Sequence, residues 1–409
     1  MSPTPNIPHA DIPVTTTFPE RPAPLPNTSP GFPQLGGTTP GSLIQMKLFD
    51  LIDPRITMSG ATAWRIRYMS TSAVDMAPVE VSGLVFVPAG DPPDKGWNVI
   101  AYDHGNTGID TDCGPSLYAD MLSTWPPVSV LLLNHYVVVV SDYEGLSGSG
   151  RHAFLNGPAL GRNVIDAVRA ATHMRPDISN RWGAFGGSLG GLATWAANEQ
   201  APTYGKGLDL VGAATWVPMV DVSELPRKAR EGRLTHDQLH LYVLTIMGLK
   251  RTTQPDMDVS RFMHGSLYDN RDLLLVCNGP RTRDALDVLA KADPADLIPV
   301  DAAAERDMTR WLSDMAVPKQ RSAAPLLVIY GSSDQLVDQA WVERALAAGC
   351  GMGDTIEWVL RPGQGHSDID AAMAFPWLIA RFDGQKPINK CELAPVAPQP
   401  LSAGAPAQG

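Results

Sequence analysis

The chain has 409 residues and a formal net charge of −11, with 32 Lys and Arg against 43 Asp and Glu. Its 44% hydrophobic residues supply a core, and its 18% charged residues are too few for a disordered chain. The acidic balance argues against a nucleic-acid partner. The sequence contains no stretch of about 18 apolar residues, so it predicts no transmembrane helix. The length favours two domains, or one large α/β domain with an insertion.

Both ends of the chain are rich in proline. Residues 1–45 are predicted to form an N-terminal arm, and residues 387–409 a C-terminal tail whose start Cys391 is placed to anchor. Proline fixes φ and donates no backbone hydrogen bond, so we expect extended segments that wrap the body or move freely. The folded body is therefore expected between them.

Between the ends, short apolar runs alternate with segments of helical periodicity. The valines at 137–140 form a continuous β-branched run, which is typical of a strand buried on both faces. Strands alternating with helices predict an α/β fold with a mostly parallel sheet covered on both faces. The predicted strands are 84–88, 98–102, 137–140, 182–185, 326–330 and 355–360, and the predicted helices are 161–174, 189–198, 337–348 and 369–382.

Residues 221–315 depart from this alternation. They look mainly helical, and apolar side chains concentrate between positions 239 and 249. An insertion of this size between two strands predicts a helical cap or lid over a body made of residues 46–220 and 316–386. The alternative is a helical subdomain that only adds stability.

The clearest local motif is G-x-S-x-G at residues 186–190, centred on Ser188. A predicted strand precedes it and a predicted helix follows, which is the setting of a nucleophile elbow. The flanking glycines suit a strained serine backbone, and the N–H of Leu189 at the helix N-terminus favours a developing oxyanion. The alternative is a glycine-rich turn in which the serine has no role.

A serine hydroxyl needs a histidine to accept its proton, and that histidine needs a carboxylate to hold its tautomer. Asp334 follows the predicted strand 326–330, and His366 follows the strand 355–360. Both are therefore expected at the strand ends where Ser188 is presented, in the chain order serine, acid, histidine. We predict that these three residues form a catalytic triad.

Two other acids, Asp368 and Asp370, compete for the role of Asp334. We expect them on the helix after His366, too close in sequence to reach its Nδ1 comfortably. A second oxyanion donor is expected from the loop after strand 98–102, where the amide of Asn106 fits the role. His104 is expected to order that loop by hydrogen bonding, and no ligand cluster supports a metal role for it.

The four cysteines are widely spaced and form no CxxC or Cys/His cluster typical of zinc. They allow three disulfide pairings, or unpaired thiols in a cytosolic enzyme. No charged segment followed by an apolar one is visible at the start of the chain, so no signal peptide is recognised. From these residues alone the compartment stays open.

Several short stretches between about residue 40 and residue 385 resemble one family. They are 40–44, 68–71, 81–83, 103–105, 113–116, 141–146, 166–171 and the elbow at 186–190. Together they are similar to the secretory lipase family of α/β-hydrolases, the Candida antarctica lipase A-like group. The resemblance implies an α/β-hydrolase fold with an inserted cap and carboxylester hydrolysis by Ser188, Asp334 and His366.

The same resemblance implies two disulfides and a location outside the cytoplasm. The disulfides are Cys113–Cys277 and Cys350–Cys391, and the protein is expected to be secreted or periplasmic. Two positions depart from the family pattern: many members have Gln where this chain has Leu189, and His or Tyr-like residues where it has Gly187. We expect Leu189 to alter the pocket wall and Gly187 to open space near the elbow.

The expected function is that of a cofactor-free and metal-free serine carboxylesterase or lipase acting on a small-molecule or lipid ester. An acyltransferase or an aromatic-ester or polyester hydrolase on the same triad is the alternative. A catalytically silent, hydrolase-like binding protein is a third reading, which would need a broken triad. Acyl-chain preference, contact with a lipid interface and oligomeric state stay open.

Overall fold

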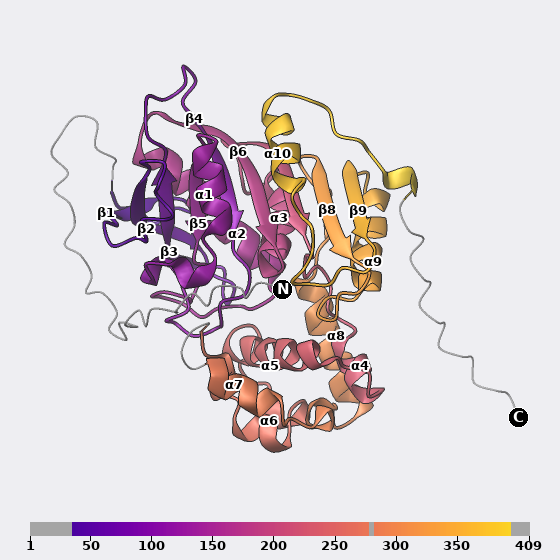
Figure 1. Cartoon of the computed structure of the whole chain (residues 1–409). Coiled ribbons are helices and arrows are strands. Elements are labelled where there is room, and N and C mark those ends of the chain that lie inside the picture. Colours follow the sequence, from indigo (N-terminus) through magenta and orange to yellow (C-terminus); the bar gives the residue numbers. More distant parts are fainter. Residues whose placement is uncertain (1–34, 278–281, 394–409) are drawn as a thin grey trace, which may run out of the picture.

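The computed structural model describes residues 35–277 and 282–393 (Figure 1). Most of the predicted N-terminal arm, residues 1–34, and residues 394–409 of the predicted tail lie outside the described residues. The start of the tail is held as expected, because Cys391 forms a disulfide with Cys350.

Within the described residues, nine strands form one sheet in the order β1-β2-β3-β5-β4-β6-β7-β8-β9. The first three strands pair antiparallel, as do β3 and β5, whereas every pair from β5 to β9 is parallel. The predicted mostly parallel α/β fold is confirmed. The strands are β1 Leu43–Leu48, β2 Thr62–Thr71, β3 Pro78–Val87, β4 Trp97–Asp103, β5 Val137–Ser141, β6 Ile178–Gly187, β7 Asp209–Trp216, β8 Leu326–Gly331 and β9 Ile356–Arg361.

Helices cover both faces of the sheet, because side chains of a strand alternate between the two faces. On β4, Val99 and Ala101 join one apolar cluster, which includes residues of α2, α3 and α9. Ile100 and Tyr102 join the other, with α1 and α10. All five residues of β5 are buried, as the valine run predicts. These helices are α1 Pro126–Leu133, α2 Gly157–Met174, α3 Leu189–Gln200, α9 Gln339–Gly351 and α10 Ala374–Phe382.

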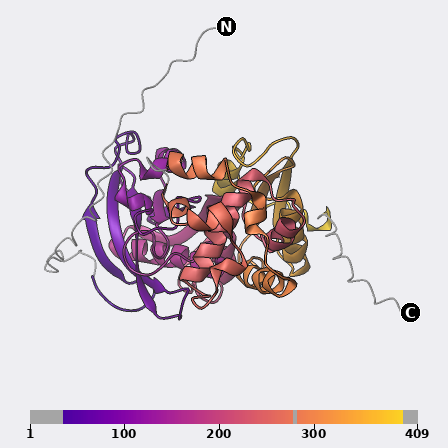
Figure 2. The same cartoon turned by 90° about the horizontal axis from the view of Figure 1, so that it is seen from below.

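The segment between β7 and β8 is helical, as the sequence predicts, and its helices gather beyond one end of the sheet (Figures 1 and 2). We call α4–α8 the cap helices: α4 Leu225–Arg230, α5 His236–Arg251, α6 Gly265–Asp269, α7 Thr282–Leu289 and α8 Ala302–Met315. The apolar residues concentrated at 239–249 lie on α5, where nearly all are buried. Short 3-10 turns are Pro115–Leu117, Met121–Ser123, Val259–Arg261, Leu273–Leu275, Pro294–Leu297 and Cys391–Leu393.

Several element boundaries differ from the predictions, and two of the differences have local reasons. Strand β6 begins at Ile178 instead of at residue 182, because main-chain pairing with β4 and β7 extends it through polar residues that hydropathy does not mark. Helix α10 begins at Ala374 instead of at residue 369. Its predicted first turn is replaced by side-chain bonds, in which Asp370 accepts the N–H of Ala372 and Gln364 accepts that of Asp370.

The described cysteines are all paired, as Cys113–Cys277 and Cys350–Cys391. The pairing implied by the family resemblance is therefore confirmed. The first bridge joins the loop after β4 to the segment that precedes α7. No helix among the described residues is long and apolar enough to cross a membrane.

Candidate active site

Ser188 stands on the sharp turn between β6 and α3 in a conformation that few non-glycine residues adopt, with φ 59° and ψ −123°. Such backbone costs on the order of 1–3 kcal/mol and persists only where surrounding structure enforces it. Gly186 and Gly190 allow that enforcement. A Cβ at Gly186 would lie 2.7 Å from the carbonyl oxygen of Asp103, and one at Gly190 would collide with the same group. The glycines are needed for the close approach of α3 to the end of β4.

The two departures from the family pattern have a different effect from the one expected. A Cβ at Gly187 would collide with the indole of Trp216, which directly ends β7. The expectation that Gly187 opens space near the elbow is therefore wrong, because the tryptophan ring occupies that space. Leu189 is 1% exposed and belongs to the core beside α2. It packs inward and does not line the cavity described below, so the expected change of pocket wall is also wrong.

The structure brings Ser188, His366 and Asp334 together in one chain of hydrogen bonds. Nε2 of His366 lies 2.9 Å from Oγ of Ser188, and its Nδ1 lies 2.9 Å from Oδ2 of Asp334. Oδ1 of Asp334 accepts the N–H groups of Leu336 and Val337 at 2.8 and 2.9 Å. The Asp334 side chain is only 3% exposed, so a charge-assisted bond to the imidazole is poorly screened by water.

The competing acids are placed elsewhere than the sequence predicts. Asp368 and Asp370 lie in the loop before α10, not on a helix. Asp368 accepts the N–H of Gly365 at 2.6 Å, and Asp370 lies 3.4 Å from the guanidinium of Arg361. Their exclusion as partners of His366 stands, but the reason is these local partners and not a helical position.

The loop after β4, residues 104–113, lies beside Ser188. The ring of His104 is buried, lies against Tyr143 at an interplanar angle of 34° with centroids 4.5 Å apart, and has Nδ1 2.7 Å from the carbonyl oxygen of Gly105. The side chain of Asn106 accepts the N–H of Gly108 at 3.0 Å, which closes a tight turn. The predicted ordering role of His104 agrees with these contacts, and Gly105 and Asn106 line the cavity over Ser188.

The helix that follows the serine begins with a backbone N–H that has no intrahelical partner. Leu189 is the first residue of α3, where an N–H has no intrahelical acceptor. Within residues 35–277 and 282–393 this N–H has no other acceptor either. The helix dipole adds partial positive charge at the same point, which favours an anion beside Oγ of Ser188.

Burial favours the uncharged forms of several ionisable groups near the site. Burial raises the pKa of Asp103 well above its usual range, although Thr194 donates to it at 2.6 Å. Burial also lowers the pKa of His104, and lowers that of His152 to about 3. Both rings are therefore neutral near pH 7, and neither adds a positive charge under the serine.

A cavity of about 530 Å³ opens over these residues. Ser188, His366 and Trp216 line it on the side of the hydrolase body. Leu241 and Leu244 on α5 are among the residues that line it on the side of the cap helices. The predicted apolar segment of the cap thus lines it, together with polar side chains that the sequence analysis missed. These are His236, Asp237 and His240, and the N-terminal position of α5 after a capping box was the signal that could have found them.

One group of potential metal ligands includes two residues of the loop 104–113. Asp112, Cys113 and Cys277 place an oxygen and two sulfurs within 4.8 Å of one another. Both sulfurs are joined in the disulfide, however, so neither is a thiolate ligand. This cluster does not fit a metal site.

Comparisons with known proteins identify lipases as similar proteins. The family model for secretory lipases matches residues 119–254, a stretch that includes the elbow and α5. The resemblance to secretory lipases is confirmed. A probable inactive lipase of Mycobacterium tuberculosis is 24% identical over 387 residues, covering 89% of this chain and 84% of that protein. Lipase 5 of Candida albicans is 24% identical over 359 residues, covering 81% and 74%.

Solved structures with the same fold include two hydrolases. Candida antarctica lipase A in its closed state has a TM-score of 0.70 at 18% identity, over 86% of this chain and 84% of that one. The rice cell wall degrading esterase LipA from Xanthomonas oryzae has a TM-score of 0.66 at 18% identity, over 85% and 100%. At these identities the likeness establishes the α/β-hydrolase fold, and together with the secretory lipase match it supports a hydrolase function.

Proposed function

We propose that the protein is a serine carboxylester hydrolase in which Ser188 is the nucleophile, His366 the general base and Asp334 the acid. The observation that carries the proposal is the unbroken chain of two 2.9 Å contacts from Ser188 through His366 to Asp334, on a strained elbow at the floor of a cavity. Strain of this kind is maintained at functional sites, which disfavours a turn with a bystander serine.

The geometry supports a two-step reaction through an acyl-enzyme. Nε2 of His366 accepts the proton of Ser188 as Oγ attacks the ester carbonyl carbon, while Nδ1–H donates to Asp334. The imidazolium then gives its proton to the leaving alcohol as the carbon–oxygen bond breaks. Water, deprotonated in turn by His366, attacks the acyl carbonyl and restores the free serine.

The oxyanion of each tetrahedral intermediate needs two donors. We propose the N–H of Leu189, at the N-terminus of α3, as one of them and the N–H of Asn106 as the other. Loss of one such donor typically costs about 3–4 kcal/mol of transition-state stabilisation. The tight turn at Asn106–Gly108 holds the loop backbone beside the serine before substrate arrives.

The cap helices are proposed to shape the substrate pocket. They supply the apolar wall at Leu241 and Leu244, and they add His240, whose Nε2 lies 2.7 Å from the carbonyl oxygen of Leu274. A cavity of about 530 Å³ with mixed polar and apolar lining favours esters of moderate size. The domain division proposed from the sequence, with a cap at 221–315 inserted into the hydrolase body, agrees with this arrangement.

Replacing Ser188 with alanine tests the proposal. We expect the variant to keep the far-UV spectrum and melting temperature of the parent and to lose p-nitrophenyl ester turnover by a factor of about 10⁴ or more. Turnover at the parental rate in purified S188A would overturn the assignment. Short, long-chain and aryl esters, each with and without an added alcohol acceptor, separate hydrolysis from acyl transfer and the lipase from the aryl or polyester reading.

A silent binding protein is the second candidate, because one relative is a probable inactive lipase. This chain retains all three residues in bonded order, which favours the enzyme. If the whole ester panel gave no turnover above S188A while an ester analogue still bound, the binding reading would replace ours.

Export from the cytoplasm is proposed on the two disulfides and the likeness to secretory lipases. Disulfides persist in oxidising compartments and are rare in the cytosol. Protein recovered from the native host, denatured without reductant, should show no free thiols. Titratable thiols in that sample would contradict the proposed export from the cytoplasm.

A further inference from the structure

Residues 334–338, here called the acid loop, carry the proposed catalytic acid from β8 toward α9. The two oxygens of Asp334 have separate partners: Oδ2 faces His366, and Oδ1 accepts the N–H groups of Leu336 and Val337. The carboxylate is thus held by the backbone of its own loop. Any displacement of this backbone therefore moves the carboxylate relative to the imidazole.

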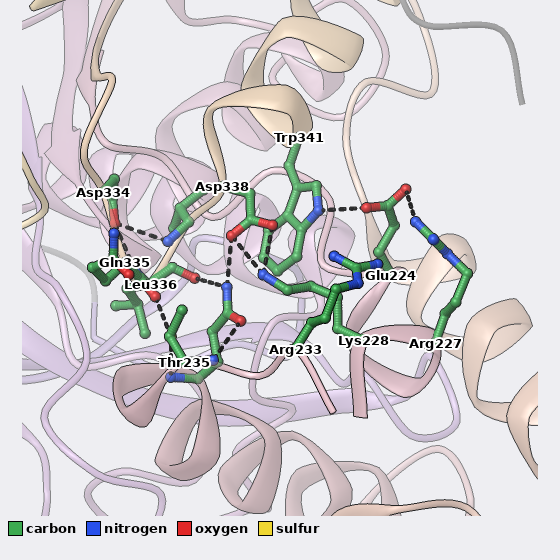
Figure 3. A network of polar contacts seen from close by, with 12 residues as sticks. Glu224, Arg227, Lys228, Arg233, Thr235, Asp334, Gln335, Leu336, Asp338 and Trp341 are labelled. Atoms are coloured by element: carbon green, nitrogen blue, oxygen red, sulfur yellow. Dashed lines mark hydrogen bonds and ion pairs between the residues drawn. The ribbon is translucent and has the colours of Figure 1, made fainter. Parts of the chain in front are cut away.

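Side chains of the cap helices and of their N-terminal ends form hydrogen bonds to the same loop (Figure 3). Oγ1 of Thr235, the N-cap of α5, donates to the carbonyl oxygen of Gln335. Nε2 of Gln238 donates to the carbonyl oxygen of Leu336 at 3.2 Å and to Oδ1 of Asp338 at 2.8 Å. Gln238 is fully buried, so these bonds do not compete with water.

Asp338 directs its carboxylate toward the cap and not toward its own helix. It is the N-cap of α9, where an aspartate normally accepts an N–H of the first turn, a bond worth about 1 kcal/mol. Among the described residues its side chain caps no N–H of α9. Its oxygens instead accept from Nζ of Lys228 on α4, at 2.9 and 2.6 Å. The N-cap position is thus used to join two segments of the chain.

Lys228 is enclosed at this junction. Its side chain is 6% exposed, and Nζ lies 5.3 Å from the centre of the Trp341 ring on α9. The indole N–H of Trp341 in turn donates to Glu224, the residue before α4, at 3.0 Å (Figure 3). A buried charge is tolerated only while its partner is present, so the position of Lys228 relative to Asp338 is tightly determined.

We propose that Lys228 and Gln238 are positioning residues for the ester hydrolysis. Through Asp338 and the carbonyl of Leu336 they fix the acid loop, and thereby the orientation of Asp334 toward His366. The inference rests on the proposed function, because it assigns Asp334 the role of catalytic acid. Neither Lys228 nor Gln238 lines the cavity, so their effect on rate passes through the loop and not through substrate contact.

Three variants separate positioning from stability. Lys228→Met removes the cation and leaves Asp338 unpaired. The double variant Lys228→Met/Asp338→Leu removes both charges, so no uncompensated charge stays buried. Gln238→Glu keeps an oxygen to accept the N–H of Thr235, as in the parent capping box, but loses the donor to the acid loop. Arg261→Met, which breaks a pair with Asp307 within the cap segment, is the matched control.

Steady-state kinetics should show a change in kcat and little change in KM. A misplacement near 1 Å costs up to about a hundredfold in rate, so we expect kcat to fall between about tenfold and a hundredfold in Lys228→Met and Gln238→Glu. The double variant should recover the melting temperature of the parent yet keep the low kcat. KM should stay within about twofold in all three, because none of the substituted residues lines the cavity.

A spectroscopic readout reports the positioning directly. The Nδ1 proton of His366, followed by proton NMR with labelled histidine, should move upfield in the three variants and stay in place in Arg261→Met. Parental kcat together with an unmoved proton resonance in the folded double variant and in Gln238→Glu would overturn the proposal. If the parent protein itself turns over no ester, the proposed function fails separately, and the resonance alone still decides whether the cap holds the acid loop.

Discussion

The cap helices meet the hydrolase body at two junctions that are built differently. Beside the 104–113 loop the junction is covalent, through Cys113–Cys277, and is reinforced by a partly exposed ion pair between Arg251 and Asp110 at 2.6 Å. Beside the acid loop there is no covalent bond among the described residues; hydrogen bonds and the buried Lys228–Asp338 pair hold it. Helix α5 connects the two, with its N-terminal capping box at one junction and Arg251 at the other.

The difference between the two junctions indicates how two parts of the proposed site, the oxyanion donors and the catalytic acid, are held in place. One of the two proposed oxyanion donors, the N–H of Asn106, belongs to a tight turn, and the Cys113–Cys277 disulfide in the same loop limits the movement of that turn. The acid is a side chain whose orientation depends on polar contacts that are specific in distance and direction. Perturbations at the acid junction are therefore expected to act on rate, and those at the covalent junction on stability.

The largest effect is expected at the acid itself. Asp334→Asn should lower kcat by about 10⁴, because an amide at this position favours the wrong histidine tautomer while leaving the fold intact. Ester turnover under saturating substrate measures it, with circular dichroism as the control for folding. A fall of less than tenfold would mean that Asp334 is not the partner that His366 requires.

The covalent junction should dominate stability. The Cys113–Cys277 bridge spans a sequence separation of 164 and the Cys350–Cys391 bridge one of 41. In the chain-entropy model their removal costs about 5 and about 4 kcal/mol of unfolding free energy. Paired Cys→Ala variants, unfolded in urea, should follow this order. The reverse order would show that the cap junction is held mainly by its other contacts.

The two ion pairs at the junctions should differ in strength. Lys228→Met leaves the carboxylate of Asp338, which is 27% exposed, without its cation and should cost about 2 kcal/mol of unfolding free energy. Arg251→Met removes a pair whose side chains are 31% and 33% exposed, and should cost less than about 1 kcal/mol. Urea unfolding of both variants at one ionic strength gives the comparison. Equal costs would contradict the contrast between a polar and a covalent junction.

A smaller, pH-dependent effect is expected where the chain returns from the cap to β8. Oε1 of Glu199 on α3 accepts the N–H of Lys319 there, and burial raises the pKa of this glutamate to about 8. The folded protein therefore keeps a proton that the unfolded chain loses, so stability falls as the pH rises from about 4.5 to about 8, by on the order of 5 kcal/mol.

Glu199→Gln should flatten this dependence. Its amide oxygen still accepts the N–H of Lys319, so the variant should resemble the parent near pH 5 and melt at a higher temperature near pH 9. Melting curves across this range provide the measurement. Identical slopes for parent and variant would mean that Glu199 is ionised in the folded state.

Much of the site was predictable because the determining signals are local. Ser188 follows from a glycine spacing with a steric cause, and Asp334 and His366 follow from their places after two apolar strands. Parallel strands bring such loops to one edge of the sheet, so chain order alone brought the three residues together. The disulfide pairing, in contrast, came from the family resemblance, since the residues alone left three pairings open.

The missed features depend on contacts between distant segments. The antiparallel strands β1 and β2 mix polar or charged residues with apolar ones, so their hydropathy is weak, and pairing of β1 with β2 and of β2 with β3 defines them. The indole of Trp216 fills the space beside Gly187 from a neighbouring strand, which no local pattern indicates. The Lys228–Asp338 pair joins residues separated by 110 positions. Sequence periodicity carries no information about such partners.

The central claim is that Ser188 is an activated nucleophile, and covalent labelling tests it most directly. The purified protein is treated with a fluorophosphonate, digested and mapped by mass spectrometry while residual ester turnover is followed. We predict one phosphonyl group on Ser188, with turnover falling in proportion to labelling. Full loss of turnover without label on Ser188, or full labelling of Ser188 with turnover intact, would contradict the account.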